Sequence, residues 1–160
     1  MKKLLVTLLS LLALTFAVSG RAATAIGNFN VTLTLNSTCQ LTTPGNMALS
    51  YTSFQTAASP SVLSNFTVSC TNGLPYALSL DAATAGAPVT VNDVTLGLAY
   101  SLSLVDNANA AVPTTANGIV GVGAAQTFKV KGDVAGNQGA GNCTVASCST
   151  TTTHTVTVTY

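Results

Sequence analysis

Apolar residues in this chain recur at every second position, in short runs separated by turn residues. In "GNFNVTLTLNSTCQ", which begins at Gly27, they are Phe29, Val31, Leu33 and Leu35, with Asn or Thr between them. "VLSNFTVSC", "LPYALSLDA" and "QTFKVKGD" alternate in the same way, and clusters of Gly, Pro, Asn and Asp lie between the runs. A period of two places alternate side chains on one face of a strand, and no segment sustains a helical period. The pattern predicts an all-β sandwich of short antiparallel strands.

Two further regions are predicted to be strands. "VTVNDVTLGLAYSLSLV" contains one or two, and four residues within it share a phase: Leu98, Tyr100, Leu102 and Leu104. The last strand is expected over roughly Thr152 to Tyr160. In "QTFKVKGD" the alternation places Phe128 and Val130 on one face and the two lysines on the other. No linker or shift in composition divides the chain into domains.

The first 25 residues have the pattern of a secretion signal. Lys2 and Lys3 form a basic start, an apolar run follows, and Ala23-Thr24-Ala25 is a cleavage site of the A-x-A kind, although cleavage after Ala22 also fits. The apolar run is shorter than the roughly 20 residues that a transmembrane helix needs. We therefore expect an exported chain without an integral membrane segment in its mature part.

The mature chain carries little charge. Two lysines, Lys129 and Lys131, stand against four aspartates, a formal net charge of −2. So few cations cannot neutralise a row of phosphates, which argues against nucleic acid as a partner. The remaining stretch of about 135 residues is long enough for one domain with a real core. Its surface must be covered by Thr, Ser, Asn and Ala, which suits an extracellular protein that packs into a larger assembly.

The four cysteines are an even number in an exported chain, so two disulfides are expected, with metal ligation as the alternative. Cys39 and Cys70 each lie in phase with the apolar residues before them, so both should point inward and pair. Cys143 and Cys148, in "CTVASC", would then close a small local loop. The loop-entropy relation assigns roughly 3–4 kcal/mol to the first bridge and roughly 2 kcal/mol to the second.

No arrangement of residues points to catalysis, which needs paired or poised groups. The single histidine, His154, has no acidic neighbour in the sequence and is expected to be exposed or at a strand edge. The aspartates lie in or beside turns, where their side chains bond the local backbone. Calcium ligation by Asp93 or Asp106 is the alternative, but the acids are single and scattered. The sequence thus predicts neither an enzyme nor a cofactor or metal site.

The order of these motifs resembles the spore coat protein U-like domain family, which includes pilins of the archaic chaperone–usher pathway. The similar parts are the leader, "TAIGNFNVTLTLNSTC", "FTVSC", "FKVKGDVAGN" and "THTVTVTY", and they span about Ala25 to Tyr160. The chain departs from many relatives at Thr153-His154, where they carry an acidic residue, and in its "CTVASC" insert. These departures leave the shape of one loop and the subclass open.

The resemblance implies an incomplete immunoglobulin-like sandwich that is completed by donor-strand exchange. A periplasmic chaperone would lend the missing strand until the N-terminal extension of the next identical or related pilin subunit replaces it at an outer-membrane usher. Residues 26–36 would be that extension and residues 37–160 the sandwich. The residues that match the donor pattern are Gly27, Phe29, Val31, Leu33 and Leu35, and those of the C-terminal strand that pairs with a chaperone or neighbour are Val156, Val158 and Tyr160.

Two functions are compatible with this reading. One is a subunit of a cell-surface pilus that serves attachment or biofilm formation. The other is a self-contained secreted coat protein or binding module, in which the N-terminal strand would turn back onto its own sandwich. The inward phase runs unbroken from Leu33 to Cys39, and Asn36-Ser37-Thr38 contains no Gly or Pro to force a reversal. Extension out of the domain is therefore favoured.

Overall fold

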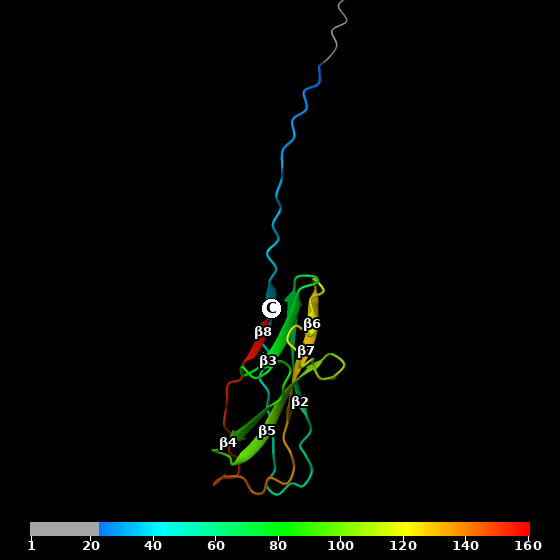
Figure 1. Cartoon of the computed structure of the whole chain (residues 1–160). Helices are drawn as coiled ribbons and strands as arrows, with labels where there is room; N and C mark the ends of the chain where they lie inside the picture. Colours follow the sequence, from blue (N-terminus) through cyan, green and yellow to red (C-terminus); the bar gives the residue numbers. More distant parts are fainter. Residues whose placement is uncertain (1–22) are drawn as a thin grey trace, which may run out of the picture. The chain divides into compact units, whose positions relative to one another are not determined.

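The structure is a computed structural model that describes residues 23–160 (Figure 1). The expected signal peptide, residues 1–25, thus lies almost wholly outside the described residues. The chain divides into one unit that ends at Thr34 and a second unit, Leu35–Tyr160, and each is described by itself. Every regular element in the described part is a β-strand, and all of the strands belong to the second unit.

Within residues 35–160, eight strands form two antiparallel sheets. The larger sheet has the order β1-β2-β7-β5-β4, made of β1 (Cys39–Leu41), β2 (Val62–Cys70), β7 (Ala125–Asp133), β5 (Leu98–Asp106) and β4 (Val89–Asp93). The smaller sheet has the order β6-β3-β8, made of β6 (Ile119–Val120), β3 (Pro75–Leu80) and β8 (Val156–Thr159). The two sheets enclose one core, so the unit is an immunoglobulin-like β-sandwich, the fold class that the sequence predicts.

The predicted alternation decides which side chains form the core. The core contains Phe66 and Val68 from β2 and Phe128 and Val130 from β7. On the other face of β7, Lys129 and Lys131 are half-buried. The inward residues of β3 are almost completely buried as well: Tyr76, Leu78 and Leu80. The alternation of apolar and polar residues predicts one apolar face for each of these strands, and the opposite sheet covers that face.

Tyr76 links the two sheets. Its ring meets the ring of Phe128 edge-on, with centroids 6.5 Å apart. Its hydroxyl donates a hydrogen bond of 3.0 Å to Oε1 of Gln126, at the start of β7. Burial raises the pKa of Tyr76 to about 12, so the phenol stays protonated and remains a donor. β3 is therefore held firmly against the larger sheet.

The structure decides one open detail of the predicted strands and corrects two others. "VTVNDVTLGLAYSLSLV" forms two strands, the β4–β5 hairpin, in which Val91 lies opposite Tyr100. The last strand is shorter than predicted, because β8 begins only at Val156. Two-residue β6 was not predicted at all, since a pair of residues is too short to show a period.

Candidate assembly surface

The predicted donor residues form no strand in the structure. From Ala23 to Thr38 no residue belongs to a strand. Its alternating apolar side chains are exposed to solvent over most of their surface, with exposed fractions of 86% for Phe29, 78% for Val31, 94% for Leu33 and 77% for Leu35. Such a row of large exposed apolar residues is unusual for a protein surface and is typical of segments that another partner covers.

β8 has one open edge. It pairs with β3 alone among the described strands, with Leu78 opposite Val158 and Leu80 opposite Val156. The backbone N–H of Asp81 donates to the carbonyl of Thr155, so hydrogen-bonded pairs of this ladder fall on the odd-numbered residues of β8. The N–H and C=O groups of Val156 and Val158 therefore point away from β3, where no other described strand takes them up.

The side chains of the same two valines face the core. Val156 and Val158 both pack against the buried cluster, yet both are only half-buried. Below, the open edge means the backbone groups and side chains of Val156 and Val158. Unpaired donors and acceptors beside half-covered apolar side chains are what an added strand would satisfy. Tyr160, the third residue predicted for this surface, follows β8 and has an exposed fraction of 57%.

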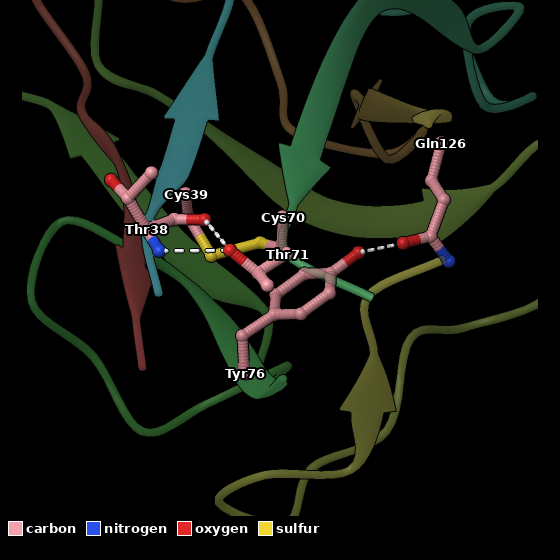
Figure 2. Close-up of a disulfide and its surroundings, with 6 residues drawn as sticks. All are labelled: Thr38, Cys39, Cys70, Thr71, Tyr76 and Gln126. Carbon is pink, nitrogen blue, oxygen red and sulfur yellow. Dashed lines mark hydrogen bonds between the residues drawn. A yellow bond between two sulfur atoms is a disulfide. The ribbon is translucent and has the colours of Figure 1, made fainter. Parts of the chain in front are cut away.

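β1 is the edge strand of the other sheet and is bound to β2 covalently. Cys39 lies opposite Cys70 in the ladder and forms a disulfide with it, and the two Cα atoms are 4.1 Å apart. Figure 2 shows how Thr38 and Thr71 extend the pairing, through a bond of 3.0 Å from the Thr38 N–H to the Thr71 hydroxyl. Both figures draw β8 next to β1. These two edge strands, one from each sheet, therefore lie on the same side of the sandwich.

The second disulfide joins Cys143 to Cys148, as the sequence predicts, and no described cysteine is free. It closes an exposed loop that is tied to the β4–β5 turn. The N–H of Asn142 donates to the carbonyl of Leu96 at 2.6 Å, and the hydroxyl of Thr150 donates to the carboxylate of Asp93. This disulfide therefore belongs to a surface loop and does not contribute to the core.

His154 lies just before the edge strand β8, which is one of the two settings that the sequence predicts, but its partners were not predicted. The imidazole is half-buried, and it has an acidic partner that lies 73 positions away in the sequence. Its Nδ1 lies 2.6 Å from Oδ2 of Asp81, and its Nε2 lies 2.7 Å from the hydroxyl of Tyr100. Although partial burial raises the pKa of Asp81, hydrogen bonds from the Thr155 N–H and from His154, with the charge of His154, hold it below its ordinary value.

The described residues contain no cluster of side chains suited to a metal ion. Between Ala23 and Tyr160, no three His, Cys, Asp or Glu side chains lie close enough together to hold an ion. The two aspartates considered for calcium bond their own turns, Asp93 with the N–H groups of Thr95 and Leu96, and Asp106 with that of Ala110. In the same residues there is no helix with the length and apolar character needed to cross a bilayer.

The comparisons with known proteins identify the family. Residues 25–142 match the model of the Spore Coat Protein U domain, which is most of the chain. No curated protein and no solved structure matched the chain. The match covers the exposed N-terminal segment, Cys39 and Cys70, and β1 to β7. Domains of this kind are structural subunits of coats and fimbriae and are not an enzyme family. The chain thus belongs to the Spore Coat Protein U domain family and has a structural role at the cell surface.

Proposed function

We propose that this chain is a subunit of an extracellular pilus or fimbria that assembles by donor-strand complementation and serves surface attachment or biofilm formation. Residues 1–25 are its signal peptide, residues 26–36 its donor extension and residues 37–160 its acceptor sandwich. A periplasmic chaperone holds the exported subunit, and an outer-membrane usher passes it to the growing fibre. The partners are identical or related subunits.

The observation that supports this proposal best is the pair of unmatched surfaces in one chain. The open edge of β8 presents backbone donors and acceptors beside half-covered apolar side chains. The segment from Gly27 to Leu35 presents an apolar residue at every second position, with the intervening positions free to face solvent. An extended segment that joins a sheet edge gains backbone hydrogen bonds, and its alternate side chains enter the apolar layer. Each surface has the chemistry that the other lacks.

The apolar residues are sufficient to hold such a joint. Burial of a large apolar side chain contributes about 1.5–3 kcal/mol, so Phe29, Val31, Leu33 and Leu35 together contribute roughly 6–12 kcal/mol before the entropy of ordering the strand is subtracted. Backbone pairing along the edge adds to this value. A subunit without a partner strand keeps both surfaces exposed and is expected to be prone to association.

The test compares two double variants that add the same charge to opposite faces of the donor. Val31→Asp with Leu33→Asp puts carboxylates into apolar positions and should abolish polymerisation. Asn30→Asp with Thr32→Asp puts them on the other face and should leave polymerisation nearly unchanged. The readout is the ladder of multimers on unheated denaturing gels. A ladder that persists with Val31 and Leu33 replaced would mean that this segment is not the donor.

A second arm separates loss of the donor from loss of the fold. The variant with Val31 and Leu33 replaced keeps its acceptor sandwich intact, so it should still bind a synthetic peptide of residues 26–36 added in solution. If the wild-type protein is instead a stable monomer that ignores this peptide, the self-contained coat protein or binding module is the better description. A single titration of the protein with this peptide therefore distinguishes the two functions.

A further inference from the structure

A chain of hydrogen bonds joins three parts of the sandwich at the start of β8. Tyr100 lies in β5 of the larger sheet, and Asp81 follows β3 directly. His154 lies two positions before the start of β8. The imidazole bonds both of the others, at 2.7 Å and 2.6 Å, and its ring meets that of Tyr100 edge-on. We call these three residues the latch. His154 thus lies at the centre of the contact.

The side-chain carboxylate of Asp81 accepts the hydrogen bond from β8 that a backbone carbonyl would normally accept in such a ladder. Its φ angle is 47° and that of Ala82 is 58°, so the chain turns out of the β3 ladder at this point. The N–H of Asp81 still donates to the carbonyl of Thr155 at 2.9 Å. The returning bond, 2.8 Å, runs from the Thr155 N–H to Oδ1 of Asp81, while Oδ2 accepts from His154. One carboxylate therefore fixes two successive residues.

The latch matters because β8 has few other anchors. The strand has four residues and one partner strand, and within residues 23–160 none of its own side chains makes a hydrogen bond to the rest of the sandwich. A short ladder of this kind is weakly specified in register. A slip by one residue would turn Val156 and Val158 away from the core and would break both bonds of the Asp81 carboxylate.

We propose that His154 is a positioning residue for strand capture. With Asp81 and Tyr100 it fixes the register of β8, so that the valines of the open edge face inward before a partner strand arrives. The identity of the arriving strand rests on the proposed function, but the effect on β8 does not. Truncation of His154 should loosen β8 locally, while the opposite sheet keeps its stability. The more β8 is loosened, the more slowly the subunit should capture a donor strand.

The test uses the full mature chain with Val31→Asp and Leu33→Asp, which removes the chain's own donor strand from competition, at a protein concentration at which size-exclusion chromatography finds a monomer. Amide hydrogen exchange is followed at Thr157 and Thr159, which face β3, and at Phe128 and Val130 in the other sheet. His154→Ala should raise exchange in β8 about tenfold or more, as expected for loss of a charge-assisted hydrogen bond, with little change in β7. Tyr100→Phe removes one bond and should have a smaller effect, and His154→Asn, which can still donate to Asp81, should recover part of the protection.

Capture is measured on the same proteins from the association rate of a peptide of residues 26–36. His154→Ala should slow association several-fold, while replacement of the exposed neighbour, Thr153→Ala, should not. Unchanged exchange in β8, or an equal rise throughout the sandwich, would overturn the proposal. So would loosened exchange without slower capture. If β8 loosens as expected but the peptide never binds the parent chain, the effect on register stands and the proposed function fails.

Discussion

Val158 lies directly opposite Leu78 in the β3–β8 ladder, yet Leu78 is wholly buried and Val158 is only half-buried. Both side chains belong to the same apolar layer and face the same core. Leu78 has β8 on one side, and on the other its carbonyl accepts a hydrogen bond from the Gly86 N–H, whereas Val158 has a neighbouring strand on a single side. The difference in burial therefore marks the position at which the smaller sheet accepts one more strand.

This asymmetry predicts different roles for the two residues in stability and in assembly. Leu78→Ala should destabilise the free sandwich by about 2–5 kcal/mol, because it leaves a cavity in a closed core. Val158→Ala should reduce the free energy of unfolding by only about 1 kcal/mol, since half of the side chain is in water already. It should nevertheless weaken binding of a donor peptide. Urea unfolding with and without the peptide measures both quantities, and equal losses in the free protein would contradict the open edge.

The two disulfides should contribute unequally. Replacement of Cys39 and Cys70 by Ser should lower the free energy of unfolding by roughly 3–4 kcal/mol, because their loop is long and they tie an edge strand to the sheet. Replacement of Cys143 and Cys148 should lower it by no more than roughly 2 kcal/mol, since that loop spans only a few residues. Denaturant melts test the order, and peptide mapping without reduction tests the pairing. A peptide that joins Cys39 to Cys143 would refute the strand phase on which the prediction rests.

Acid should weaken the anchoring of β8. The folded-state pKa of Asp81 lies below its ordinary value of 3.8, because the bonds from Thr155 and His154 outweigh partial burial. The stability that this group contributes is therefore fully present above about pH 4 and is lost as the pH falls through the lower folded-state value. Asp81→Asn should be less stable at neutral pH and should decline less below pH 4. Thermal melts from pH 6 to pH 2 measure the slope, and identical slopes would contradict the role of this carboxylate.

The mature protein produced without assembly partners should be unstable or self-associating, since β8 leaves backbone groups unpaired. A peptide of residues 26–36 at a hundred times its dissociation constant should stabilise it by about 2.7 kcal/mol. Size-exclusion chromatography and thermal melts at several protein concentrations provide the measurement. Cooperative, concentration-independent melting of a monomer would favour a self-contained coat protein.

Local alternation was enough to predict most of the sandwich from the sequence. Strands β2 and β7 each alternate apolar and polar residues over nine positions. The residues that this alternation predicts to point inward are the ones that are buried. The same phase argument brought Cys39 opposite Cys70, because cysteines that point inward from neighbouring strands need no twist to bridge. The scarcity of cations argued against nucleic acid before any geometry was known. These properties depend on composition and on residues that are close together in the sequence.

The latch and the extent of β8 were decided by the tertiary structure alone. Asp81 and Tyr100 lie 73 and 54 positions from His154, and only the antiparallel return of β8 beside β3 brings the three together. Thr152 and Thr153 carry the same strand-forming character as the residues of β8, yet the ladder ends where Asp81 turns away and its carboxylate replaces the backbone acceptor. Periodicity reports which face of a strand is apolar. Which strand lies beside it, and which edge stays open, depends on contacts between residues that are far apart in the chain.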